Sequence, residues 1–168
     1  MSFMQTVERR WGERKLGLEP VTVTASTHVA AKAERVWALL MAPELSTLVD
    51  PSVVRAFRVP GTPVGEVGEQ QCFITDAGND RRSVTLMEIA KVEPPVRVVV
   101  RCSTSPTAFV VTYTLVPDEA GLSLSCQWDA LVEKGYRRKA EPTLRDECQK
   151  QINQIAAAIR SGFTIPDM

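Results

Sequence analysis

The sequence has 168 residues, of which 44% are hydrophobic and 24% are charged, with 9 Gly and 11 Pro. These values are ordinary for a globular chain of one domain and exclude a disordered, collagen-like or coiled-coil protein. Lys and Arg together number 20, as do Asp and Glu, so the formal net charge is zero. A neutral chain has no general attraction to nucleic acid or to an anionic membrane, and no apolar run approaches the roughly 18 residues of a membrane span. We therefore expect a cytoplasmic protein with no nucleic-acid partner and no stable membrane insertion.

The first 19 residues form a charged arm, in which a helix is expected. Met4, Val7 and Trp11 follow one another at spacings of three and four, which would place them on one helical face. Gly17 and Pro20 end the arm. The apolar face could pack on the rest of the chain or on a second copy in a homodimer.

From Val21 the hydrophobic pattern changes to a period of two, which is typical of a strand. Two short helical segments follow, and they end at Pro43 and Pro51 because proline cannot continue a helix. Six further strand-like runs are then separated mostly by short polar turns, which favours an antiparallel meander. The expected strands are 21–29, 53–59, 70–75, 82–91, 96–102, 107–116 and 122–132, and the expected short helices are 30–41 and 43–50.

The last segment is predicted to be one long helix of about 20 residues, from Pro142 to Ser161. It contains no glycine, and its only proline stands at the expected first turn, where proline is tolerated. Gly162 is expected to cap its end. One apolar stripe at helical spacing runs along it: Leu144, Cys148, Ile152, Ile155 and Ile159.

The four cysteines and the single histidine show no metal-binding pattern. Cys72, Cys102, Cys126 and Cys148 lie more than 20 residues apart, whereas zinc ligands usually come in closely spaced pairs. We expect buried, reduced thiols that behave as small hydrophobic groups. His28 lies on the strand face opposite Val21 and Val23 and is expected at the surface. No metal and no cofactor are predicted.

Several short segments mark this order of elements: AERVWALL at 33–40, Pro43-Glu44, Asp50-Pro51, PVGEVG at 63–68 and Glu93-Pro94-Pro95. Together with the order of one strand, two short helices, six strands and one long helix, they resemble the START-like helix-grip superfamily (SRPBCC), and within it the bacterial polyketide cyclase/dehydrase and lipid-transport group. The resemblance implies an α+β helix-grip domain over residues 20–163, followed by a tail at 164–168. Its curved seven-stranded antiparallel sheet surrounds the long C-terminal helix, and two short helices lie between strands 1 and 2. Members often carry a Trp before the Asn/Asp-Pro pair, where this chain has Val49.

The resemblance also implies an internal apolar cavity between sheet and helix. The period-two rule indicates which side chains point inward. Several inward positions are small, namely Cys72, Cys102, Cys126 and Ala130, which indicates unfilled space, although a solid core remains the alternative. The expected ligand-binding residues are Phe73, Val100, Phe109, Val111, Tyr113, Trp128, Leu144, Cys148, Ile152 and Ile155.

Alternate connections of a meander lie at one end of its sheet, so loops 76–81, 103–107 and 133–139 are expected together. The sequence KGYRRK precedes the long helix and adds four positive charges. This end could form a cavity mouth that favours an anionic head group, or simply a solvated charged loop. The expected mouth residues are Arg81, Arg137, Arg138 and Lys139.

Three functions are compatible with this interpretation. The first is binding or transport of a hydrophobic small molecule such as a lipid, an isoprenoid or a polyketide-like metabolite. The second is a cyclase, aromatase or dehydratase, which needs an acid or base inside the cavity, and Tyr113 is the one inward candidate. The third is a protein-interaction module that uses the N-terminal arm or the outer face of the sheet.

Overall fold

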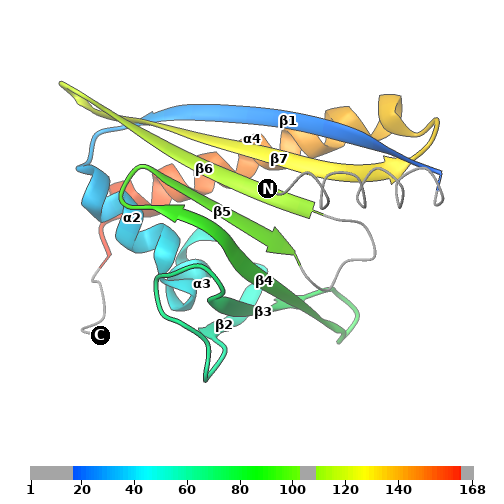
Figure 1. Cartoon of the computed structure of the whole chain (residues 1–168), viewed down its shortest axis with the longest axis horizontal. Helices are drawn as coiled ribbons and strands as arrows, with labels where there is room; N and C mark the ends of the chain where they lie inside the picture. Colours follow the sequence, from blue (N-terminus) through cyan, green and yellow to red (C-terminus); the bar gives the residue numbers. More distant parts are fainter. Residues whose placement is uncertain (1–16, 103–108, 164–168) are drawn as a thin grey trace.

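The computed structural model describes residues 17–102 and 109–163 (Figure 1). The arm face of Met4, Val7 and Trp11, the loop 103–107 and the tail 164–168 lie outside the described residues. The elements in chain order are β1 (Leu18–Val29), α2 (Ala33–Met41), the 3-10 turn η1 (Pro43–Leu45), α3 (Ser46–Val49), β2 (Val53–Arg58), β3 (Gln70–Asp76), β4 (Arg82–Glu93), β5 (Arg97–Cys102), β6 (Phe109–Asp118), β7 (Gly121–Glu133) and α4 (Arg137–Ser161).

The seven strands form one curved antiparallel sheet in the order β1-β7-β6-β5-β4-β3-β2, which confirms the predicted helix-grip architecture (Figure 1). Strands β2 to β7 pair with their neighbours in sequence, whereas β1 pairs with β7 from Leu18↔Glu133 to Val29↔Leu122. As a result β1 and β2 lie at opposite edges of the sheet. The segment that joins them, α2 to α3, must therefore cross one face of the sheet.

Helix α4 begins at Arg137, five residues before the predicted start at Pro142. A proline in the sixth helical position leaves the carbonyl of Arg138 without its usual donor, a cost that is tolerated so near the helix start. The contact that favours the earlier helix start comes from a residue far away in the sequence. The Glu19 carboxylate accepts the backbone N–H groups of Gly135 at 3.1 Å and Arg137 at 3.3 Å, and a negative charge stabilises a helix N-terminus. Gly162 is the C-cap, as predicted.

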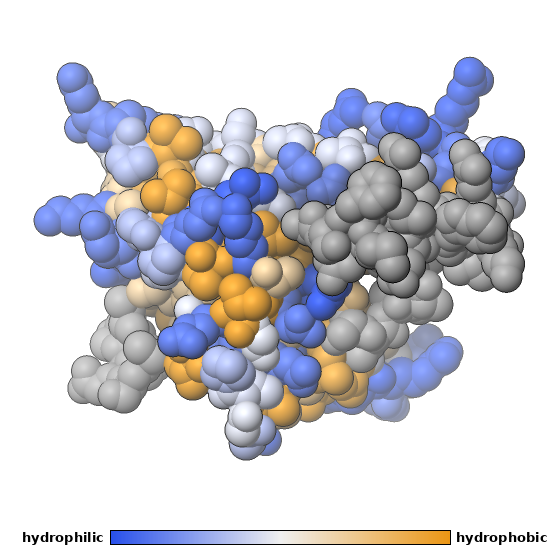
Figure 2. Space-filling view, viewed as in Figure 1, coloured by the Kyte–Doolittle hydropathy of each residue, from blue (hydrophilic) through white to orange (hydrophobic). Residues whose placement is uncertain are grey.

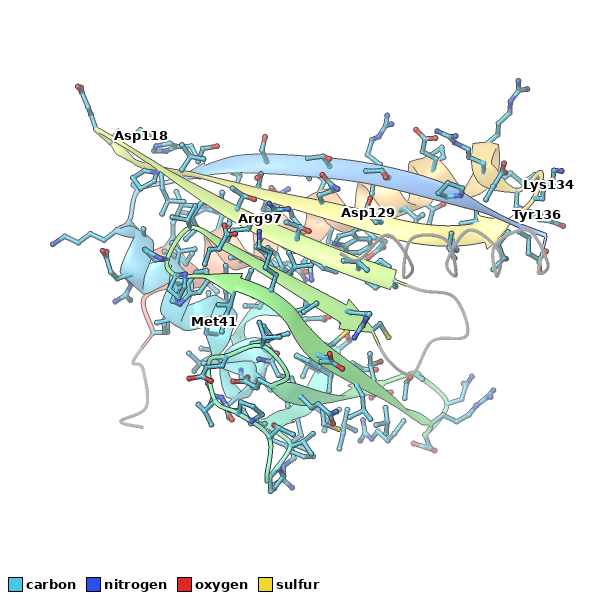
Figure 3. All side chains as sticks on the ribbon, viewed as in Figure 1. Met41, Arg97, Asp118, Asp129, Lys134 and Tyr136 are labelled. Atoms are coloured by element: carbon cyan, nitrogen blue, oxygen red, sulfur yellow. The ribbon has the colours of Figure 1, made fainter. Side chains whose placement is uncertain are left out.

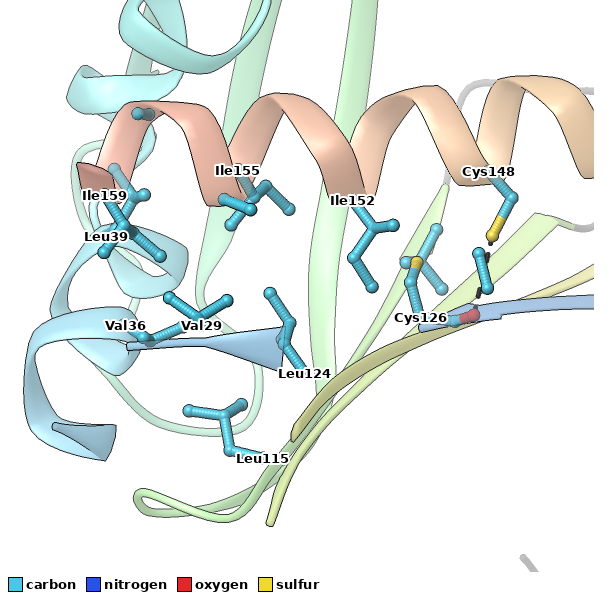
Figure 4. Packing of buried hydrophobic residues seen from close by; sticks show 14 of the residues in the cluster. Val29, Val36, Leu39, Leu115, Leu124, Cys126, Cys148, Ile152, Ile155 and Ile159 are labelled. Atoms are coloured by element: carbon cyan, nitrogen blue, oxygen red, sulfur yellow. Dashed lines mark hydrogen bonds between the residues drawn. The ribbon is translucent and has the colours of Figure 1, made fainter. Parts of the chain in front are cut away.

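The solid core lies between α4 and the β1–β7 side of the sheet (Figure 4). The helix turns its predicted apolar stripe toward these strands, and Cys148, Ile152, Ile155 and Ile159 are buried. Its opposite face carries polar side chains, so the stripe accounts for the position of the helix. The strand residues that meet it include Val21, Val23, Val29, Leu115, Leu122, Leu124 and Cys126, all buried.

The surface mixes polar and apolar side chains. On the face in Figure 2, hydrophobic residues gather near the middle, and hydrophilic residues project along the edges. Among the described residues no helix is both long and apolar enough to cross a membrane. His28 is exposed, as predicted, and its Nε2 lies 3.2 Å from a carboxylate oxygen of Asp118. The large exposed hydrophobic residues come from many elements: Leu48, Val54, Val64, Val67, Val84, Val96, Val116 and Tyr136.

Candidate functional site

A cavity of about 260 Å³ lies between the inner face of strands β2 to β6 and the helices that cross it. Most of its wall is aliphatic or aromatic, with a few polar side chains. The sheet contributes Val53, Gln71, Phe73, Thr75, Thr85, Met87, Ile89, Val98, Val100, Phe109, Val111 and Tyr113. The covering segments contribute Leu39, Leu40, Met41, Ser46, Val49, Asp50, Gln151 and Ile155.

The cavity exists because α4 covers only part of the curved sheet. The helix packs on β1 and β7, while the short segments η1 and α3 lie over β2. Strand alternation then decides which residues face the opening. Gln71, Phe73 and Thr75 of β3 line the cavity, so Cys72 between them points to the other face. The prediction of an inward Cys72 is therefore wrong, because adjacent strand residues cannot share a face.

The structure divides the ten predicted ligand-binding residues into three groups. Leu144 lines a neighbouring groove, and Trp128, Cys148 and Ile152 belong to the core around α4. These four are displaced from the cavity because the middle of α4 is pressed against β1 and β7. Contact with a ligand stays a prediction for all ten. The six that line the cavity are Phe73, Val100, Phe109, Val111, Tyr113 and Ile155.

The residues of α2 and α3 that cover the cavity were not predicted from the sequence. Leu39, Met41 and Val49 come from α2 and α3, which are too short for a periodic pattern to orient. The sequence did give one indication of these residues, because members of the resembled family often carry a Trp at position 49. Val49 indeed lines the cavity. A smaller side chain than Trp at this position leaves more of the cavity open.

A polar cluster lies where α4 meets the cavity. Oε1 of Gln151 accepts a hydrogen bond from the indole Nε1–H of Trp128 at 3.0 Å and one from the thiol of Cys126 at 3.6 Å. Tyr113 stands directly opposite Cys126 in the β6–β7 pair, so their side chains are neighbours. Of these four residues, Tyr113 and Gln151 line the cavity. Tyr113 and Trp128 were predicted from the sequence as ligand-binding residues, whereas Gln151 was not.

The titratable groups of this cluster favour their neutral forms. Burial raises the pKa of Tyr113 well above its ordinary value, and the adjacent thiols add to the effect. Burial likewise raises the pKa of the Cys126 thiol and, to a lesser extent, that of Cys148. A thiol held in its protonated form is a poor nucleophile, and a phenol held neutral is a poor base. The cluster is therefore suited to hydrogen bonding.

A second polar group adjoins the cavity at Gln71. Glu69 is fully buried, and its carboxylate accepts the backbone N–H of Gly65 and the side-chain Nε2–H of Gln71, the latter at 2.6 Å. Nε of Arg58 lies 3.5 Å from Oε1 of Glu69, and NH1 of the same Arg58 bonds Glu44 at 3.1 Å. This network could not be predicted from the sequence, because Glu69 follows a polar, glycine-rich turn that is typical of a surface loop.

An open groove of about 670 Å³ adjoins the cavity and shares Thr85 and Phe109 with it. Lys139 and Tyr136 lie on the groove, with the lysine Nζ 5.8 Å from the centre of the exposed tyrosine ring. Figure 3 shows Lys134 and Tyr136 at the end of the sheet where α4 begins, far from Asp118. The other wall residues of the groove are Cys102, Ala130, Leu131, Val132, Ala140, Thr143 and Leu144.

The four predicted mouth residues do not form one cluster around an opening. Lys139 lines the groove, whereas Arg137 forms an ion pair with Glu141 at 3.3 Å and lies outside the groove wall, as does Arg138. Arg81 lies in the β3–β4 turn, and three strand spacings, about 14 Å, separate β4 from β7. A ligand-binding role for these four residues stays a prediction.

No group of three or more His, Cys, Asp or Glu side chains that could hold a metal ion occurs in the part of the chain that the structure describes. Cys72, Cys126 and Cys148 are buried and form no disulfide, in agreement with the expected buried thiols, whereas Cys102 is only partly buried. The site is thus an apolar cavity with two polar groups on its wall.

A family model described as polyketide cyclase / dehydrase and lipid transport matches residues 20–160, which is most of the chain. The chain belongs to this family. The matched stretch contains the whole sheet from Pro20 onward and almost all of α4, so it contains every residue of the cavity wall. No significant match was found among curated proteins.

Solved structures of low sequence identity share the fold. A Staphylococcus aureus protein of unknown function is 12% identical, with a TM-score of 0.74, and the match covers 86% of this chain and 96% of the other. The di-domain ARO/CYC StfQ of the steffimycin biosynthetic pathway is 15% identical, with a TM-score of 0.70 and coverage of 95% and 56%. Truncated norcoclaurine synthase from Thalictrum flavum is 14% identical, with a TM-score of 0.67 and coverage of 88% and 98%. At these identities the likeness establishes the fold alone.

Proposed function

We propose that this protein binds and carries a hydrophobic small molecule in the cavity between its sheet and helices. The observation that supports the proposal is the cavity wall itself, which is mostly apolar and includes a few fixed polar groups. This composition is typical of small-molecule sites, where apolar contact supplies affinity and a few polar atoms fix the orientation. Each Å² of apolar ligand surface removed from water contributes about 25 cal/mol, less the cost of ordering the ligand.

The volume restricts the class of ligand. A cavity of about 150 Å³ is enough to bind benzene, so about 260 Å³ accommodates a molecule of two fused rings or a short isoprenoid. A longer lipid or polyketide-like molecule would have to extend past Phe109 into the groove. In that arrangement its outer end would meet Lys139, which would favour an anionic head group.

Binding is better supported than catalysis. The enzyme alternative, a cyclase, aromatase or dehydratase, needs a group that exchanges a proton near neutral pH. Tyr113 is the predicted candidate, and burial raises its pKa away from that range. Its hydroxyl is suited to orienting a ligand through a hydrogen bond.

The first test is native mass spectrometry of freshly purified full-length protein, followed by solvent extraction of any bound molecule. We expect a stoichiometric apolar compound, or, for an empty protein, binding of the fluorescent apolar probe anilinonaphthalene sulfonate at one site. A protein that has no co-purified ligand and fails to bind the probe would contradict the proposal. That result would favour the protein-interaction function instead.

Two further expectations belong to this proposal. One is a cytoplasmic location. The other is a homodimer contact through the N-terminal arm, to be tested by light scattering on the full chain and on a variant that lacks residues 1–19. An unchanged molar mass and stability in the shortened variant would count against a role for the arm.

A further inference from the structure

The orientation of the Gln151 side-chain amide is fixed by its partners. The indole Nε1–H of Trp128 can only donate a hydrogen bond, so the Gln151 atom 3.0 Å from it must be the oxygen. The same Oε1 accepts the thiol of Cys126 at 3.6 Å. A carbonyl oxygen has two lone pairs, and both now have donors. The oxygen is therefore already engaged within the protein.

The remaining polar atom of this side chain is Nε2, which carries two N–H donors. The hydrogen bonds found for Gln151 among the described residues both end on Oε1, and the side chain lines the cavity. Its neighbourhood is otherwise apolar, with Ile155 and Val111 on the same wall. Tyr113 stands opposite Cys126 and adds a hydroxyl to the same part of the wall.

We propose that Gln151 is a specificity-determining residue, which selects hydrophobic ligands that carry a carbonyl oxygen, such as ketones, quinones or lactones. The inference rests on the function proposed above. A ligand with such an oxygen accepts a hydrogen bond from Nε2, whereas a purely hydrocarbon ligand of the same shape buries an unpaired N–H donor. Leaving a buried donor without a partner is costly, so the site discriminates between the two. Trp128 is the positioning residue that holds the amide in this orientation.

The test compares two bicyclic probes of nearly equal shape, β-acetylnaphthalene and β-isopropenylnaphthalene. They differ by the exchange of a carbonyl oxygen for a methylene group, and each is measured by its displacement of anilinonaphthalene sulfonate. The quantity of interest is the ratio of the two affinities in wild type divided by the same ratio in Gln151→Met. General changes in packing and hydrophobicity cancel in this quotient. We expect a quotient of about threefold to tenfold, the value of one net hydrogen bond.

A second variant tests the positioning role. Trp128→Phe keeps an aromatic ring and removes the indole N–H, which releases the amide to turn its oxygen into the cavity. The ketone preference should fall by about twofold or more although Gln151 is present. An unchanged preference in both variants would overturn the inference while binding itself stood. A protein that binds neither anilinonaphthalene sulfonate nor either naphthalene probe would instead refute the proposed binding function, and this inference with it.

Discussion

Phe109 of β6 packs edge to face on Trp128 of β7, with ring centres 5.1 Å apart and ring planes at 83°. This geometry is favourable for aromatic pairs. Phe109 also lines both the cavity and the groove, so its ring forms part of the wall between them. Trp128 in turn is held by its hydrogen bond to Gln151. A chain of contacts therefore connects α4 to the partition between the two spaces.

Replacing Phe109 by Ala should open this partition. We expect association and dissociation of anilinonaphthalene sulfonate to become several-fold faster in stopped-flow measurements, because a bulky side chain no longer separates cavity from groove. The matched control is Val110→Ala, the next residue on the opposite face of β6, which should leave both rates unchanged. Equal rates in wild type and Phe109→Ala would show that molecules reach the cavity by another route.

Filling the cavity should weaken binding without unfolding the protein. Val100 lines the cavity, and Phe at this position would occupy much of the space of about 260 Å³. We expect Val100→Phe to weaken probe binding at least about tenfold, equivalent to about 1.4 kcal/mol. The control is Val99→Phe, whose side chain points to the other face of β5. Circular dichroism should show both variants folded, and equal probe affinities would argue that the probe binds elsewhere.

Tyr113 should remain protonated in the folded protein at pH values where tyrosine ordinarily ionises. The chain has two tyrosines, so the variant Tyr136→Phe leaves Tyr113 as the only one. Burial raises the pKa of Tyr113 in the folded state, so its contribution to stability is present below about pH 10 and is lost as the pH rises further. Tyrosinate absorbance of this variant should therefore appear together with alkaline unfolding. Ionisation near pH 10 with the far-ultraviolet spectrum unchanged would contradict the prediction.

Glu69 should contribute far more to stability than its exposed counterpart Glu44, although both pair with Arg58. Glu69 is fully buried, and replacing it by Leu removes the carboxylate next to Nε of Arg58 and the acceptor of the Gln71 amide. We expect Glu69→Leu to lower the free energy of unfolding by about 3 kcal/mol. Glu44→Gln should cost less than about 1 kcal/mol, because its ion pair is solvent-screened. Urea denaturation of both variants measures these free energies of unfolding. Similar losses in the two variants would mean that the buried network does not contribute specially to stability.

The sequence predicted the sheet and the helix stripe because each depends on a repeated spacing. Val111, Tyr113 and Leu115 alternate along β6, and Cys148, Ile152 and Ile155 recur along α4, so both patterns are visible without a structure. What escaped prediction depends on single contacts between distant residues. The Glu19 carboxylate that begins α4 lies 118 positions from Arg137.

The candidate site was predictable only in part for the same reason. Strand alternation pointed to Phe73, Val100 and Phe109, which do line the cavity. The same rule could not tell that Ile152 packs against β1 and β7, because helix spacing fixes a face but not the element that it meets. Gln151 sits next to that stripe and carries a polar side chain, so only the Trp128 contact reveals its place in the site.

The position of α4 makes the two halves of the sheet structurally different. Beside β1 and β7 the helix makes a filled interior, and over β3 to β5 the chain leaves a hollow. Substitutions in the filled half are expected to lower stability, whereas partly exposed wall residues such as Phe73 and Val100 can change with less effect on packing. In such a fold, a few residues of the cavity wall can change the shape of the cavity, while the core residues around α4 maintain the stability. That separation offers a physical reason why one architecture recurs at identities as low as 12%.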